Sequence, residues 1–103
     1  MVREKYQIMN AAIQVVPLEK SSAAMEIIDR SIEIIQKSGL NYSVSAFETS
    51  VDGSWEEIIS LITSLKNQLN GESIEDALIN VKFQISNGKS VVGEDKIKKI
   101  HKK

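Results

Sequence analysis

The chain has 103 residues, of which 42% are hydrophobic, with 13 basic and 14 acidic side chains and no cysteine. The net charge of −1 argues against a general nucleic-acid binder, which needs a basic surface for phosphates, and the lack of cysteine excludes disulfides, thiolate catalysis and cysteine-ligated zinc. No apolar run approaches the roughly 20 residues of a membrane helix and the first ten residues lack the apolar core of a signal peptide, so we expect one cytoplasmic domain over residues 1–103, with neither membrane nor nucleic acid as partner.

The first predicted elements are a strand over residues 7–16, closed by Pro17, and a helix over residues 22–38. Ser21 or Ser22 can cap the helix, and Gly39 is a natural stop. The strand alternates, with Met9, Ala11, Ile13 and Val15 on one face and Asn10, Ala12, Gln14 and Val16 on the other. The expected buried stripe of the helix is Ala24, Ile28, Ile32 and Ile35, widened by Ile27 and Ile34.

A pair of strands is predicted between residues 42 and 53. The chain turns around Glu48 into a second strand through Thr49 and Val51, which Asp52-Gly53 ends. In the first strand of the pair, Tyr42, Val44 and Ala46 share one face, opposite Ser43, Ser45 and Phe47.

A second helix begins after this pair with a capping box. The Ser54 oxygen can accept the backbone N–H of Glu57, and the Glu57 side chain can reach back. The helix ends near Asn70-Gly71. Its expected buried stripe is Ile58, Ile62, Leu65 and Leu69.

The last predicted strand covers residues 77–86. Asn87-Gly88 signals a tight turn, residues 90–92 can return as a short strand, and the tail from Gly93 is a weak basic helix. Two faces alternate along the main strand: Ile79, Val81, Phe83 and Ile85 against Asn80, Lys82, Gln84 and Ser86.

The element order is strand, helix, strand, strand, helix, strand, followed by the short C-terminal extension. Two strand-helix-strand crossovers, right-handed by default, give a four-stranded antiparallel sheet with both helices on one face. We therefore predict an α+β, ferredoxin-like βαββαβ sandwich.

The sheet face opposite the helices is predicted to be polar and nearly uncharged. Such a face is compatible with solvent, with another copy of the chain, or with a polar ligand, because amides and hydroxyls both donate and accept. The last two alternatives do not exclude each other. Its expected residues are Asn10, Ala12, Gln14, Val16, Ser43, Ser45, Phe47, Asn80, Lys82 and Gln84.

Few residues offer catalytic chemistry. His101, the only histidine, lies in the tail and is expected to be solvated. Glu56 and Glu57 are neighbours on a helix and point apart, so capping and dipole roles explain them better than paired catalysis. Trp55 is expected to anchor packing. No phosphate-binding loop and no cluster with metal-ligand spacing is present, so an enzyme is the weakest functional hypothesis.

The ordered set of motifs resembles the small thiamine-binding protein family. These motifs are "IQVVPL" at the end of the first strand, "IIDRSIEII" in the first helix and "SGLNYSVSAFETSVDGSWEEI" after it. The resemblance spans nearly the whole chain. Asp52 stands where glutamate is usual, and Glu48 where a small or amide residue is common. The positions that match the family pattern are Val15-Val16-Pro17, Gly39, Tyr42, Val44, Thr49 and Gly53.

The resemblance implies a non-enzymatic binder of thiamine or its hydroxymethylpyrimidine moiety, with no further cofactor, that forms a homodimer or homotetramer through its sheets. The implied roles are Phe47 stacking on the aminopyrimidine and Glu48 or Asp52 accepting from its amine or attracting the thiazolium charge. The side chains that would match the edge of the pyrimidine are Thr49, Ser45, Gln14 and Asn80. The alternative is a structural or regulatory homo-oligomer without a small-molecule ligand.

Overall fold

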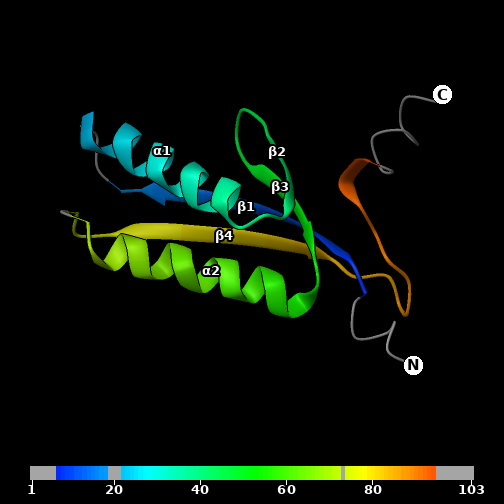
Figure 1. Cartoon of the computed structure of the whole chain (residues 1–103). Helices are drawn as coiled ribbons and strands as arrows, with labels where there is room; N and C mark the ends of the chain where they lie inside the picture. Colours follow the sequence, from blue (N-terminus) through cyan, green and yellow to red (C-terminus); the bar gives the residue numbers. More distant parts are fainter. Residues whose placement is uncertain (1–6, 19–21, 73, 95–103) are drawn as a thin grey trace.

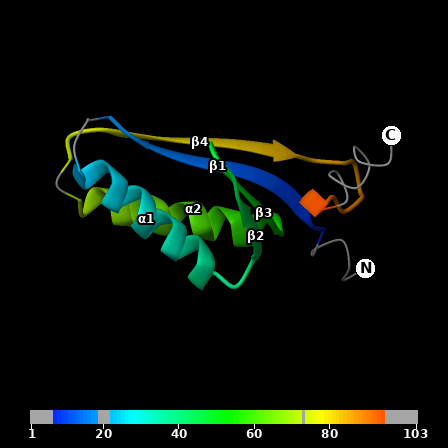
Figure 2. The same ribbon diagram turned by 90° about the horizontal axis from the view of Figure 1, so that it is seen from above.

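The computed structural model describes residues 7–18, 22–72 and 74–94 and has the predicted βαββαβ order (Figure 1). The strands form one antiparallel sheet in the order β2-β3-β1-β4, and both helices cover the same face, as the view from above shows (Figure 2). The elements are β1 (Met9–Pro17), α1 (Ser22–Lys37), β2 (Asn41–Val44), β3 (Thr49–Gly53), α2 (Trp55–Asn70) and β4 (Ala77–Gln84). The predicted ferredoxin-like arrangement is confirmed.

The core lies between the helices and the centre of the sheet. β1 and β3 supply Ile13 and Val51, and both side chains are almost fully buried against the helices. The expected alternation of β4 is confirmed, because Ile79 and Val81 pack on this core while their neighbours along the strand are exposed. The helix residues in the core cluster are Ile35, Leu61 and Leu65.

The start of α2 and the end of α1 follow the local sequence signals. Ser54 Oγ accepts the Glu57 N–H at 3.2 Å, and Glu57 Oε1 accepts the Ser54 N–H at 2.8 Å, so the predicted capping box forms. α1 ends just before Gly39, whose φ of 80° lies in the region that favours glycine.

The buried stripes of the helices are rotated from those expected. Ile27, Ser31 and Ile35 are the buried residues of α1, whereas Ile28 and Ile32 are only half-buried. In α2, Leu61 takes the buried place expected for Ile62. Apolar spacing alone could not fix either rotation, because both stripes are wide and the contacts with the sheet select their centre.

Three further expectations about the ends of strands were wrong. β2 stops at Val44, so Phe47 belongs to the hairpin loop and not to a strand face. β4 stops at Gln84, which leaves Ile85 59% exposed. Residues 90–92 form no strand, although the Val91 N–H donates to Ile8 O at 2.8 Å. The predicted tail helix lies almost entirely outside the described residues.

The sheet face without helices, here called the open face, is only partly open. The segment around Gly93 lies against it at one end, because the Gly93 N–H donates to Asp52 Oδ1 at 3.0 Å. Asn10, expected on an open surface, is therefore buried. At the other end of this face, Leu78 is 48% exposed and lies next to Val16 in register.

Candidate functional site

A cavity of about 330 Å³, here called the notch, lies between β1, α1 and the hairpin loop of residues 45–48. It exists because the strands differ in length. β4 pairs with β1 from Asn10 to Pro17, but β3 pairs with it only from Met9 to Ile13. The edge of β1 beyond Ile13 therefore has no strand beside it on the β3 side. The lining residues are Ile13 to Pro17, Ala24, Ile28, Ser31, Ile32, Ile35 and Val44 to Thr49.

The apolar wall of the notch comes from α1. Ile28 and Ile32 are half-buried because they face this cavity and not the sheet. Ser31 lies between them and is 3% exposed. Its hydroxyl is within donating distance of two oxygens, Ile27 O at 2.9 Å and Gln68 Oε1 at 3.1 Å. The rotation of α1 therefore places two isoleucines that were expected in the core at the surface of a cavity.

The hairpin loop closes the other side. Ser45 donates to Glu48 O from its backbone N–H at 3.0 Å and from its hydroxyl at 2.7 Å, which fixes a tight turn. Phe47 lies in this loop and is 82% exposed. Thr49 follows it as the first residue of β3, is 5% exposed, and makes no hydrogen bond through its hydroxyl with any described residue.

Five of the seven ligand-binding residues predicted from the sequence line the notch: Gln14, Ser45, Phe47, Glu48 and Thr49. Two of them have side-chain partners on the open face. Asn80 Nδ2 donates to Gln14 Oε1 at 3.1 Å, and Glu48 Oε1 lies 3.6 Å from Lys82 Nζ. The amide of Gln14 is therefore turned away from α1, and Gln14 borders the notch chiefly through its backbone.

The structure does not bring the other two predicted residues, Asp52 and Asn80, into the notch. Asn80 lies on the open face. Asp52 belongs to a hydrogen-bonded group, here called the Asn10 cluster, with Asn10, Ser50 and the backbone of Gly93. Asn10 Nδ2 donates to Ser50 Oγ and to Asp52 Oδ1, both at 2.9 Å. Asp52 thus binds neighbouring segments of its own chain.

Sequence analysis missed Val15, Ile28 and Ile32 as residues of the site. Val15 and Ile32 read as core residues because each falls on an apolar face. A usable signal was the mismatch in strand lengths. The sequence predicted the first strand over residues 7–16 but left only Thr49 to Gly53 for the strand before the cap at Ser54, so part of the first strand had to lack a neighbour.

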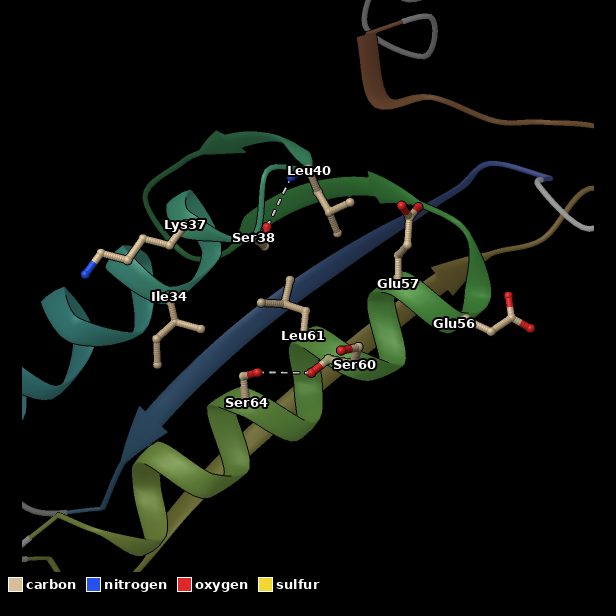
Figure 3. A pocket seen from close by; sticks show the side chains of 9 residues that line it. All are labelled: Ile34, Lys37, Ser38, Leu40, Glu56, Glu57, Ser60, Leu61 and Ser64. Carbon is tan, nitrogen blue, oxygen red and sulfur yellow. Dashed lines mark hydrogen bonds between the residues drawn. The ribbon is translucent and has the colours of Figure 1, made fainter.

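A larger cavity of about 560 Å³ lies between the C-terminal end of α1 and the start of α2 (Figure 3). Ile34, Leu40 and Leu61 form its apolar floor. Its polar rim is largely engaged in holding the helices, because Glu57 caps α2 and the Ser64 hydroxyl donates to Ser60 O at 3.2 Å. It contains none of the predicted site residues, so we place the candidate site in the notch.

A surface ion pair is linked through Gln68 to Ser31, which lies in the wall of the notch. Arg30 on α1 binds Glu72 beyond α2 through two hydrogen bonds, and Gln68 donates to the same carboxylate at 2.6 Å. The hydrogen bonds from Arg30, and then from Gln68, lower the pKa of Glu72. Because Gln68 also accepts from Ser31, this network joins the two helices behind the notch.

Two features of the described residues bear on the class of site. None of the helices there is long and apolar enough to cross a membrane. Within the same residues, no group of three or more histidine, cysteine, aspartate or glutamate side chains is placed to hold a metal ion. The described lining of the notch consists instead of apolar side chains, backbone, a few hydroxyls and the carboxylate of Glu48.

Residues 11–101 match the family model described as thiamine-binding protein. Over 53 residues the chain is 26% identical to the UPF0045 protein CPE1503 of Clostridium perfringens, an alignment that covers 52% of this chain and 56% of that relative. The chain thus matches about half the length of this curated relative.

Solved structures share the fold. A Thermotoga maritima protein with a proposed role in thiamine biosynthesis or salvage superposes with a TM-score of 0.81 at 28% identity, covering 90% of this chain and 98% of that one. A Bacillus cereus domain of unknown function gives a TM-score of 0.82 at 23% identity, covering 91% and 90%. The second likeness concerns the fold alone.

Proposed function

Because the chain belongs to the thiamine-binding protein family, we propose that it binds thiamine or its hydroxymethylpyrimidine moiety in the notch without transforming it. The observation that carries this proposal is the convergence of five predicted ligand residues on one cavity. Its volume of about 330 Å³ lies within the range of small-molecule sites. The likeness to the Thermotoga protein supports the same ligand class.

The composition of the notch suits an aminopyrimidine. Such a ring has two apolar faces and an edge of hydrogen-bonding groups, so it needs apolar walls and a few fixed polar atoms. Ile28 and Ile32 supply a wall, and Phe47 in the exposed loop is available to cover the ring. The Thr49 hydroxyl supplies a polar atom that no other described residue uses.

The thiazolium part of thiamine carries a positive charge, and among the described residues that line the notch Glu48 is the one with an ionisable side chain. Its carboxylate lies at the mouth, 38% exposed, near Lys82. We assign it a modest steering role, because an exposed carboxylate attracts a cation only weakly in water. Hydroxymethylpyrimidine, which lacks this charge, would depend less on Glu48 than thiamine does.

We assign the site a binding role without turnover. Among its described lining residues, neither histidine nor lysine lies beside the hydroxyls of Ser45 and Thr49, and the Ser45 hydroxyl already donates to Glu48 O. The role we assign is to carry or buffer the ligand in the cytoplasm.

Isothermal titration with thiamine and with hydroxymethylpyrimidine tests the proposal. We expect saturable binding of one ligand per notch, weakened about tenfold or more in Phe47→Ala, because the loop then loses its aromatic cover. Ile59→Ala is the matched control, since Ile59 is 38% exposed on α2 away from the notch. No heat and no thermal shift at millimolar ligand would refute the proposal.

We also infer that the chain associates with itself through the open face. The face offers Val16, Leu78 and the amides of Gln14 and Asn80, which bond to each other, while the charge of Lys82 is paired with Glu48. Association around Val16 and Leu78 therefore buries apolar surface and desolvates little unpaired charge. Light scattering at micromolar concentration should give a dimer or tetramer mass. Leu78→Asp should lower that mass, and Leu18→Asp, at a comparably exposed leucine outside the sheet, should not. A monomer mass for the unaltered chain contradicts the inference.

A further inference from the structure

The free edge of β1 contributes backbone groups to the notch, and their direction follows from the strand register. In an antiparallel ladder both backbone groups of a residue point to the same neighbouring strand, and successive residues alternate between the two neighbours. The Leu18 N–H donates to Asp76 O at 3.0 Å, on the β4 side. The register is continuous from Asn10 to Pro17, so Val16 and Gln14 also point to β4.

Val15 therefore points the other way, into the notch, with both its N–H and its C=O. β3 ends its pairing at Ile13, so no strand accepts these groups. Pro17 has the same direction but lacks an N–H. The notch thus presents one adjacent donor–acceptor pair, fixed by the ladder that binds β1 to β4, and Val15 is among its lining residues.

The side chains around the notch leave few other polar groups free. The Ser45 hydroxyl is used by Glu48 O, the Gln14 amide by Asn80, and the Ser31 hydroxyl by Ile27 O and Gln68. Thr49 supplies the remaining hydroxyl.

An aminopyrimidine has the complementary pair along one edge, with a ring nitrogen that accepts beside an exocyclic amine that donates. The geometry points to Val15 as the residue that selects the ligand. Its N–H donates to the ring nitrogen, and its C=O accepts from the 4-amino group. This inference rests on the proposed function, and it assigns the hydrogen-bonding specificity to backbone instead of to the amides expected from the sequence.

The same contact fixes the orientation of the ring. Hydrogen bonds to a strand edge lie in the plane of the sheet, so the ring extends this plane from β1 toward the loop of residues 45–48. One face of the ring then lies over Ile28 and Ile32 of α1. A strand of another chain fits this edge less well, because only Val15 offers both groups and Pro17 offers no donor.

A pair of ligands tests the inference on the unaltered protein. In the 4-oxo analogue of hydroxymethylpyrimidine, the carbonyl replaces the amine and the ring nitrogen carries a hydrogen, so the donor and acceptor are exchanged. We expect calorimetry to show weaker binding of the analogue by about 10- to 100-fold, because the backbone pair then meets like groups. Equal affinities would overturn the inference and leave the proposed function intact, whereas binding of neither ligand would overturn both.

Val15→Pro removes the N–H while sparing the ladder to β4, because that N–H faces the notch. We expect a loss of hydroxymethylpyrimidine affinity of at least about tenfold, whereas the control Ile59→Ala, on α2 away from the notch, keeps it. A folded Val15→Pro chain that binds normally would overturn the inference. If Val15→Pro fails to fold, amide hydrogen exchange in the unaltered chain gives a second test. The ligand should slow the exchange of the Val15 N–H and leave that of the Val16 N–H unchanged. An unchanged exchange rate at Val15 would contradict the proposed contact.

Discussion

The notch and the Asn10 cluster lie on opposite faces of the sheet, and both take residues from β1 and β3. In the cluster, Asn10, Asp52 and the Gly93 N–H bind one another, so its polar groups are satisfied within the chain. In the notch, the Thr49 hydroxyl and the Val15 backbone have no such partners among the described residues. A polar group that its own chain already satisfies has little left for a ligand, so the two regions should respond differently to mutation.

The largest expected effect is on the stability of the cluster. Asn10→Ala removes the donor to Ser50 and Asp52 from a site where Asn10 is 6% exposed, and we expect a loss of about 2 kcal/mol in the free energy of unfolding. Thiamine affinity should be unchanged. Urea unfolding and calorimetry measure the two quantities.

Asn80→Ala is the matched control for Asn10→Ala. Asn80 also donates to a side chain, Gln14, but it is exposed, so we expect a change in stability of less than about 0.5 kcal/mol. It should also leave ligand affinity unchanged, because Asn80 lies outside the notch. Ligand affinity that falls in either variant would contradict the separation of the two regions.

The next effect is on binding. Thr49→Val keeps the shape of the side chain and removes the hydroxyl, which no described residue uses. We expect thiamine affinity to fall about tenfold while the melting temperature stays the same or rises. Thr63→Val on α2 is the control, because the Thr63 hydroxyl is exposed and donates to Ile59 O away from the notch. A stability loss in Thr49→Val without a loss of affinity would make Thr49 structural.

A smaller effect is expected at Gly93. An added Cβ there would lie 2.9 Å from Ser50 Oγ and 3.0 Å from Asn10 Nδ2, so Gly93→Ala must shift the segment or the cluster. We expect a loss of about 1 kcal/mol and faster amide exchange at Gly93, with unchanged ligand binding. Gly71→Ala is the comparison, since its Cβ meets nothing closer than 3.5 Å. Equal effects at both glycines would argue against close packing at the cluster.

The smallest expected effect is on folding stability at low pH. The hydrogen bond from Arg30 lowers the pKa of folded Glu72, so this group stabilises the fold above its unfolded pKa near 4.5 and loses that contribution as the pH falls through the folded value. We expect Glu72→Gln to flatten the fall in stability at low pH only slightly, because the pair lies at the surface. If Glu72→Gln removed most of the fall in stability at low pH, the hydrogen bonds among Arg30, Glu72 and Gln68 would contribute more to folding stability than we expect.

Much of the fold follows from the sequence itself. The alternation of β1 and β4, the capping box at Ser54 and the stop at Gly39 are local, because each depends on residues within a few positions along the chain. They suffice to give the element order, and the crossover rule then gives the sheet with both helices on one face. The resemblance to the thiamine-binding family rested on the same ordered segments.

Only the tertiary structure decided which face of each helix and strand lies against the core, the notch or the Asn10 cluster. The rotation of α1 that turns Ile28 and Ile32 toward the notch depends partly on its packing against α2, where Ser31 meets Gln68, 37 residues further along the chain. Asp52 is drawn into the cluster by Asn10 and Gly93, each about 40 residues away. The free backbone of Val15 depends on where β3 stops. A local pattern fixes what a residue can do, but a partner distant in sequence determines whether that capacity is used within the chain or left for a ligand.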